Sequence, residues 1–366
     1  MQMKAGRTDT SKKKTYRMLG LMSGTSLDGL DVAYCSFTFD QANRSWKFSL
    51  HEAITYPYPA RWKRTLSNAH LLPGAELIAL HHAYGKWLGE KVNAFLKKHK
   101  RSRPEAIASH GHTIFHQPDK GFTFQLGDCN ALHAATGLPV VSDFRSLDVA
   151  LGGEGAPLVP VGDRYLFGEY DYCLNLGGIA NISMEQAGVR RAFDICFCNM
   201  GFNLLADEAG RTFDVKGRIA SGGVIHKKLL DQLNKVYGRY RKRRPSLGRE
   251  IFERDFKRLL SNRKIPLADR MRTFSESVAM EIKRTISENH GKMLVTGGGA
   301  WNTFLMDRLK GIMNHIVMVV PDVRILGFKE AIVFGFLGVL RIRGEVNVLS
   351  SVTKAKLDSC TGVRIG

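Results

Sequence analysis

Two segments of this 366-residue chain repeat one design, in which an apolar strand, a glycine-rich turn and a second strand follow one another. The first segment covers residues 20–34, and the second covers residues 172–183. Each is followed further along the chain by a strand that ends in a turn rich in histidine or glycine, at residues 106–113 and 293–302. Such a duplication is typical of two related lobes rather than of a short-period solenoid. The sequence therefore predicts an α/β fold of two like lobes that enclose a cleft.

The first turn carries more polar groups than a hairpin requires, since an Asn-Gly or Asp-Gly pair would suffice. Its glycines allow the backbone to approach phosphate oxygens closely. The hydroxyl groups of Ser23, Thr25 and Ser26 can donate hydrogen bonds to those oxygens. Asp28 or Asp31 can hold a magnesium ion, either directly or through water. We therefore favour a phosphate-handling role for this turn over a purely structural one.

The length of the chain suits two α/β domains better than one core. Its longest apolar run, residues 331–340, is bounded by charged residues and is shorter than the roughly 20 residues of a membrane-spanning helix. The N-terminus lacks the apolar region of a secretory signal. We therefore expect a cytoplasmic protein that does not contact the membrane, with residues 1–14 as a disordered basic arm. The six cysteines are scattered and are expected to be reduced and mostly buried.

The formal net charge of +20 raises the question of nucleic-acid binding. Basic residues concentrate at 12–14, 97–103 and 239–244, but no helix-turn-helix, RNP or zinc-finger pattern accompanies them. We therefore expect no nucleic-acid partner, and interpret the charge as an attraction for small anions such as ATP. His110, His112 and His116 are interpreted as packing or cleft-wall residues rather than as a transition-metal site.

The region between the two lobes, residues 120–160, contains polar motifs with little hydrophobic periodicity. Arg145 offers a planar guanidinium that suits a carboxylate or a phosphate. Asp143 and Asp148 suit sugar hydroxyls, and the glycines of residues 152–155 provide flexibility. A salt-bridged hinge explains the same residues equally well, and both alternatives stay open.

Asp194 is the candidate catalytic base of the second lobe, because it follows an apolar strand and precedes an apolar loop. A carboxylate in such surroundings tends to have a raised pKa and to accept protons. The alternative role, an N-cap of the next helix, is disfavoured by the distance along the chain, and Asn199 is the better cap.

The chain resembles the anhydro-N-acetylmuramic acid kinases, a family of the actin/Hsp70/sugar-kinase superfamily, over most of its length. The resemblance rests on residues 22–31, 109–116, 125–128, 143–146, 155–160, 175–181 and 297–300. It implies a two-lobed actin-like ATPase with ribonuclease H-like duplicated lobes and an interlobe cleft. The implied lobes are residues 15–143 with about 342–366, and residues 144–341. The resemblance also allows a homodimer.

The family opens the 1,6-anhydro bridge of its sugar with water and transfers the γ-phosphoryl group of ATP to O6, giving N-acetylmuramic acid 6-phosphate. The resemblance places the base at Asp194, and the carboxylates of the first turn place Mg²⁺ at Asp28, either directly or through water. It assigns ATP and phosphate contacts to Gly24, Thr25, Ser26, Leu27, Asp28, Gly29, Leu30, Asp31, Gly177, Gly178, Gly297, Gly298 and Gly299. It assigns sugar contacts to His112, Asp128, Arg145, Asp148, Gly155 and Asn199.

The chain departs from the family pattern around the expected base. The family commonly has Phe-Asp-Thr-Gly-Pro-Gly-Asn, whereas residues 193–199 read Phe-Asp-Ile-Cys-Phe-Cys-Asn. A bulkier, less polar loop would alter sugar selectivity. The alternatives are therefore a kinase for another anhydro sugar or a hexose, and a sugar sensor without catalysis.

Overall fold

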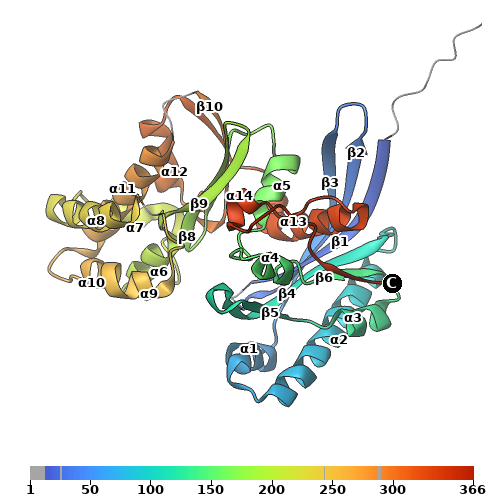
Figure 1. The fold of residues 1–366 in the computed structure, drawn as a ribbon. Helices are drawn as coiled ribbons and strands as arrows, with labels where there is room; N and C mark the ends of the chain where they lie inside the picture. The colour runs from blue at the N-terminus through green and yellow to red at the C-terminus, as the bar shows by residue number, and fades with distance from the viewer. Residues whose placement is uncertain (1–12, 25–26, 243, 287–289) are drawn as a thin grey trace, which may run out of the picture. The chain divides into compact units, whose positions relative to one another are not determined.

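The computed structural model describes residues 13–24, 27–242, 244–286 and 290–366. The chain divides into two compact units (Figure 1). The first unit takes the chain up to Leu166 together with Gly327–Gly366, and the second takes Phe167–Leu326. The boundaries expected from the sequence, at residues 143 and 341, differ from this division. Helices α4 (Ser146–Ala150) and α5 (Val159–Leu166) contact strands of the first sheet and therefore belong to the first unit.

The first unit is built on a mixed sheet whose central strands lie in the order β3-β2-β1-β4-β6. Strand β1 pairs antiparallel with β2, and β2 pairs antiparallel with β3, whereas β4 and β6 continue the sheet in parallel. The short strand β12 pairs with β6, and β5 pairs with β4. The bounds are Lys13–Ser23 for β1, Gly29–Asp40 for β2, Ser45–Pro57 for β3, Ala106–Gln117 for β4, Phe122–Leu126 for β5, Val140–Ser142 for β6 and Val363–Ile365 for β12.

Strand β1 begins within the segment that was expected to be an N-terminal arm. Lys13 and Lys14 already pair with Asp40 and Phe39 in the first hairpin, so they belong to β1. The rest of the expected arm, residues 1–12, lies outside the described residues.

The second unit repeats this strand order, with β9-β8-β7-β10-β11 in its sheet. The pairs β7–β8 and β8–β9 are antiparallel, and β7–β10 and β10–β11 are parallel, as in the first sheet. The bounds are Tyr172–Leu176 for β7, Ile179–Gln186 for β8, Val189–Phe197 for β9, Gly291–Thr296 for β10 and Ile316–Val319 for β11. The prediction of two related α/β units is therefore confirmed by their topology.

Helices cover both faces of the first sheet (Figure 1). On one face, Leu19 and Leu21 of β1 share a core with Tyr84 and Leu88 of α2 (Gly74–Lys98). Helix α3 (Cys129–Thr136) packs against α2. Helix α1 (Ala60–Asn68) precedes α2 in the chain. On the other face, α13 (Val323–Arg343) lies so close to β1 that a Cβ on Gly20 would stand 1.8 Å from the carbonyl oxygen of Ala331. Only glycine permits this approach.

The second unit has a core of its own, to which its sheet and its helices contribute. Phe202 of α6 packs edge-on against Phe274 of α11, with ring centroids 5.0 Å apart, and Phe256 packs against Phe197 of β9 at 4.9 Å. The helix bounds are Asn199–Asp207 for α6, Arg218–Ser221 for α7, Lys227–Tyr240 for α8, Arg249–Ile251 for α9, Lys257–Leu260 for α10, Leu267–Thr285 for α11 and Thr303–Ile312 for α12. A further short helix, α14 (Ser350–Thr353), belongs to the first unit.

Residues 120–160, which the sequence presented as a connecting region, fold into short elements: β5, α3, β6, α4 and the start of α5. All six cysteines are free thiols, and four of them are buried. Within the described part of the chain, no helix combines the length and apolar character needed to cross a bilayer.

Candidate functional site

The first hairpin turn follows directly on a buried chain of polar side chains. Ser23, the last residue of β1, has its Oγ 2.9 Å from Nδ1 of His112 and 2.6 Å from the hydroxyl of Tyr58. The Tyr58 hydroxyl in turn contacts that of Tyr84. Burial lowers the pKa of His112 to about 4, so its ring is neutral near pH 7. His112, expected at the sugar, thus anchors the strand end before the turn.

The turn itself is shorter than the sequence suggested. Leu27 adopts a left-handed conformation, and its N–H lies 3.4 Å from the Gly24 carbonyl oxygen, whereas Thr25 and Ser26 lie outside the described residues. Gly29, Leu30 and Asp31 belong to β2 rather than to the turn. A Cβ on Gly29 would stand 2.5 Å from the Tyr56 carbonyl oxygen in β3, so packing within the sheet already requires this glycine.

The hairpin places two carboxylates, Asp28 and Asp31, near enough for their charges to interact. Thr55 Oγ1 donates a 2.5 Å hydrogen bond to Asp31 Oδ1. Burial raises the pKa of Asp31, the Thr55 hydrogen bond opposes this, and the nearby charge of Asp28 raises it further. A bound cation would relieve that repulsion. Among the described residues no group of three or more His, Cys, Asp or Glu side chains could hold a metal, so water and phosphate oxygens would complete the shell, as Mg²⁺ prefers.

Arg145 ties the middle of β4 to the glycine-rich loop at residues 152–155. Its Nε donates to Nε2 of His110 at 3.0 Å, and its Nη1 donates to the Gly155 carbonyl oxygen at 2.6 Å. His110 Nδ1 lies 2.9 Å from the Gly111 carbonyl oxygen, so the ring is neutral with its proton on Nδ1. Burial, and then the charge of Arg145, hold the pKa of His110 well below its ordinary value.

Glu330 is a site candidate that the sequence reasoning missed. Glu330 keeps an exposed side chain, but the protein atoms around it displace water and so raise its pKa; the charges of Arg145 and Lys329 oppose this, and the charge of Asp31 adds to it. Burial also lowers the pKa of Arg145 to about 10, and the negative charge of Glu330 is the largest influence that opposes this shift. Glu330 therefore lies near the Arg145 and Asp31 side chains. Its signal in the sequence was a lone carboxylate immediately before the apolar run of residues 331–340.

Two of the expected sugar contacts have structural roles. Asp148 is fully buried, and its carboxylate accepts hydrogen bonds from the Gly155 N–H at 2.8 Å and from Thr353 Oγ1 at 2.7 Å. Asp128 caps α3 by accepting the Ala131 N–H at 2.6 Å. The same carboxylate lies 3.6 Å from His81 and 3.4 Å from His82. These partners occupy both carboxylates.

A polar pocket of about 220 Å³ lies against β4 and β5 in the first unit. Two of its lining groups, Ser109 Oγ and Gln125 Oε1, are buried and have no hydrogen-bond partner among the described residues. Asp143, with a left-handed backbone, also lines it. Buried polar groups without a partner cost stability, so water or a ligand is expected to satisfy them.

The glycines expected at ATP in the second unit come together around Leu176. The N–H groups of Asn199 and Met200 donate to the carbonyl oxygens of Gly177 and Gly178 at 3.0 and 3.1 Å, and Asn199 Nδ2 donates to Leu176 O at 2.9 Å. From the other side, Cβ atoms on Gly297 and Gly299 would stand 2.7 Å from backbone or side-chain carbon atoms of Leu176, and Gly298 lies between them.

Asn199 is not the N-cap of α6, as the sequence suggested. It is the first residue of the helix, and the capping position falls to Cys198, whose side chain makes no capping hydrogen bond. The side-chain amide of Asn199 instead donates to the carbonyl oxygen of Leu176, beside the glycine hairpin. Asn199 therefore lies with the expected ATP residues rather than apart from them.

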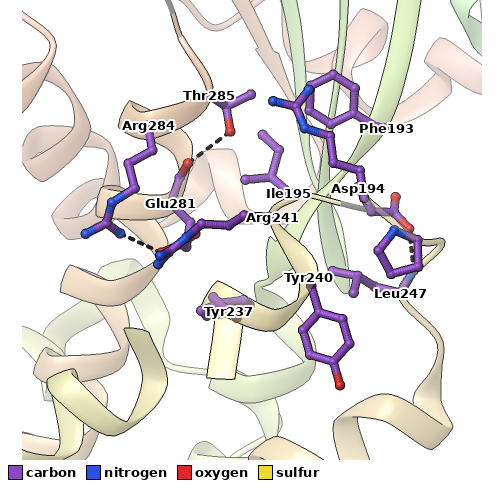
Figure 2. Close-up of a pocket in the computed structure, with 12 residues that line it drawn as sticks. Phe193, Asp194, Ile195, Tyr237, Tyr240, Arg241, Leu247, Glu281, Arg284 and Thr285 are labelled. Carbon is purple, nitrogen blue, oxygen red and sulfur yellow. Dashed lines mark hydrogen bonds and ion pairs between the residues drawn. The ribbon is translucent and has the colours of Figure 1, made fainter. Parts of the chain in front are cut away.

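Asp194 lines a pocket of about 90 Å³ in the second unit (Figure 2). Its Oδ2 accepts the N–H of Leu247 at 2.8 Å. The pocket is otherwise lined by aromatic, apolar and charged side chains: Phe193, Ile195, Tyr237, Tyr240, Arg241, Arg244, Pro245, Leu247, Glu281, Arg284 and Thr285.

The surroundings of Asp194 correct two expectations. Asp194 lies within β9 rather than at its end, because the strand continues to Phe197. Cys196, Phe197 and Cys198 are fully buried, so the residues that depart from the family pattern pack into the core, and only Ile195 lines the pocket. An irregularity at Ile195 places Asp194 opposite Asn181 and Cys196 opposite Ala180. Ala180 and Asn181 are neighbours on β8 and therefore face opposite sides of the sheet. Their partners on β9, Cys196 and Asp194, consequently face opposite sides as well.

Two sheets of one topology, each with a glycine hairpin beside its central strand, define a duplicated α/β protein. The chain belongs to the anhydro-N-acetylmuramic acid kinase family, whose model matches residues 16–365. The protein named anhydro-N-acetylmuramic acid kinase in Vibrio parahaemolyticus is 34% identical, covering 94% of this chain and 97% of the relative. The protein of the same name in Sulfurimonas denitrificans is 32% identical, with 94% and 98% covered.

Two solved structures resemble the chain weakly. The activator of 2-hydroxyisocaproyl-CoA dehydratase from Clostridium difficile with bound ADPNP gives a TM-score of 0.40 at 12% identity, with 89% of this chain and 97% of that chain covered. A ROK family glucokinase from Streptomyces griseus in complex with glucose and AMPPNP gives 0.38 at 11%, with 88% and 98% covered. Likenesses of this strength support no conclusion about function.

Proposed function

We propose that the protein is an ATP-dependent kinase that opens the 1,6-anhydro ring of anhydro-N-acetylmuramic acid and phosphorylates O6. The product is N-acetylmuramic acid 6-phosphate, an intermediate of cell-wall recycling. Membership of the family over residues 16–365 carries this proposal. The position of Asp194 beside a pocket supports it. Because ATP is the phosphoryl donor, we place the reaction in the cytoplasm.

Asp194 is the proposed general base. Water attacks the anomeric carbon, its proton passes to the Asp194 carboxylate, and the bond from that carbon to O6 breaks. The freed O6 then attacks the γ-phosphorus, and ADP leaves. The Leu247 N–H fixes one carboxylate oxygen at 2.8 Å and thereby orients the other lone pairs.

The glycine hairpins are the proposed contacts for the phosphate chain of ATP. In the first unit these are Gly24 and its neighbours in the turn, with Asp28 and Asp31 holding Mg²⁺. In the second unit they are Gly177, Gly178 and Gly297–Gly299, which Asn199 holds together. When bound, Mg²⁺ would offset the negative charge of the phosphates. Arg145 and the polar pocket around Gln125 are the proposed sugar-recognition groups of the first unit.

The test is an ADP-release assay on anhydro-N-acetylmuramic acid, anhydro-N-acetylglucosamine, levoglucosan and glucose. We expect turnover on the first sugar. In ¹⁸O-labelled water the product should carry one heavy oxygen, which reports attack of water at the anomeric carbon. Turnover on glucose alone, without label, would instead indicate an ordinary hexose kinase. Sugar binding without ADP release would indicate a sensor.

A further inference from the structure

Three arginines line the pocket of Asp194, and two of them are held by one carboxylate (Figure 2). Arg241 donates from Nε and Nη2 to Glu281 at 2.9 and 2.6 Å. Arg284 donates to the same carboxylate at 2.6 Å. Glu281 is buried, and its lone pairs are therefore committed to these two guanidinium groups. Glu281 therefore does not neutralise the charge of the third arginine of the pocket.

The third arginine, Arg244, lies over the ring of Phe193, with 3.8 Å between the guanidinium carbon and the ring centroid. Phe193 precedes Asp194 in β9. Among the residues that the structure describes, no carboxylate forms an ion pair with Arg244. Its side chain is open to solvent, although partial burial lowers its pKa. Arg244 thus presents an uncommitted cation next to the proposed base.

Stacking on an aromatic ring uses the face of a guanidinium and leaves the N–H donors at its edge free. Those donors form a planar fork that matches both oxygens of a carboxylate. Stacking also restrains the long side chain before a ligand arrives, which reduces the entropy lost on binding. The backbone of Arg244 is held in the left-handed region, at φ 41°, and its N–H donates to Tyr240 O at 2.8 Å.

We infer that Arg244, stacked on Phe193, binds the carboxylate of an acidic sugar whose anomeric carbon is presented to Asp194. This rests on the proposed function, and deepens it. N-acetylmuramic acid differs from N-acetylglucosamine by a lactyl ether that carries a carboxylate. Arg244 would therefore select the muramic acid over the neutral sugar. Arg239 and Arg241 of the basic run at residues 239–244 pair with Asp255 and Glu281, and the inference gives a role to Arg244, the last residue of that run.

The experiment compares anhydro-N-acetylmuramic acid with anhydro-N-acetylglucosamine, which keeps the ring and the acetamido group but lacks the carboxylate. Hydrogen bonds to charged groups contribute enough for a loss of roughly 10- to 100-fold. We expect Arg244→Gln to lower the ratio of kcat/KM for the acid to kcat/KM for the neutral sugar by that factor, chiefly because KM for the acid rises. Arg244→Lys should recover only part of the loss, because it lacks the planar fork.

Arg239→Gln is the matched control, because Arg239 belongs to the same basic run, does not line the pocket and pairs with Asp255 at 3.6 Å. It should leave the preference between the two sugars as it is. Equal losses on both sugars for Arg244→Gln, or no loss, would overturn the inference.

Calorimetric binding of both sugars separates this inference from the proposed function. If the wild-type protein turns over neither sugar, the proposed function is wrong, and binding still shows whether Arg244 distinguishes the acid from the neutral sugar. If the acid binds no more tightly than the neutral sugar, the carboxylate site is wrong, whatever the outcome of the kinase assay. A thermal melt of each variant checks that the fold is retained.

Discussion

At the scale of single residues, the proposed chemistry depends on a carboxylate that one backbone N–H holds at 2.8 Å. We expect Asp194→Asn to lower kcat by about 10²–10⁴-fold, the usual contribution of a positioned base. The amide oxygen can still accept the Leu247 N–H but cannot take a proton from water. The affinity for ATP, measured by calorimetry, should stay close to that of the wild type. Near wild-type turnover by a variant with an unchanged melting temperature would exclude Asp194 as the base.

His112 makes stability depend on pH. Its pKa in the folded protein, about 4, lies below the ordinary value of 6.5, so the unfolded chain binds more protons between these values. The contribution of His112 is therefore fully present above about pH 6.5 and is lost as pH falls toward 4. The loss amounts to at most about 3 kcal/mol. His110, whose pKa is also lowered, adds a change of the same sign.

Urea unfolding at several pH values measures this dependence. We expect His112→Asn to reduce the fall in unfolding free energy between pH 6.5 and 4. Tyr58→Phe is the control, since it breaks the same hydrogen-bonded chain at Ser23 and leaves the titrating ring in place. It should lower stability at every pH with the wild-type slope. Identical slopes in His112→Asn and the wild type would contradict the assignment.

At the scale of elements, the close packing of α13 on β1 depends on Gly20. Gly20→Ala should destabilise the protein by about 3 kcal/mol, the upper range for overpacking a core. Gly311→Ala, in helix α12, is the control, because a Cβ there meets nothing within 4 Å. Alanine should stabilise that helix by about 0.5–1 kcal/mol. Urea unfolding measures the free energy of unfolding of both variants. Equal changes in the two variants would mean that α13 can move away from β1 at little cost.

The elements that could be predicted from the sequence are those with a long periodic pattern, such as β1, β2 and α2. Elements were missed in residues 120–160, where β6 has three residues and α4 has five, too few for a period to be recognised. Helix α8 and strand β11 of the second unit were missed as well. The site shows the same limit. The role of Asp148 depends on Thr353, which is 205 positions away in sequence, and no local spacing reveals such a partner.

At the scale of the whole molecule, the two units differ in how the chain builds them. The second unit, Phe167–Leu326, is one continuous segment with its own sheet and core. We expect this segment, expressed alone, to unfold cooperatively in urea, as followed by circular dichroism. An absence of a cooperative transition would show that its core is insufficient without the rest of the chain.

The first unit needs both ends of the chain, because α13 covers one face of its sheet. Residues 1–166 alone would expose Met18 and Phe37, which are fully buried in the complete chain. We expect this segment to aggregate, and to become monomeric when a segment of residues 323–366 is co-expressed. Size-exclusion chromatography distinguishes the two outcomes.

The irregularity at Ile195 constrains the number of residues in this part of β9 more than their chemical identity. Residues 193–199 differ from the family pattern at four successive positions, yet they are equal to it in number. An extra residue in a strand shifts the alternation of all residues that follow it. An insertion or deletion between Asp194 and Cys196 would therefore turn either the carboxylate or the buried Cys196 to the wrong face. Substitutions there are tolerable where they fill the core, whereas a change of length is not.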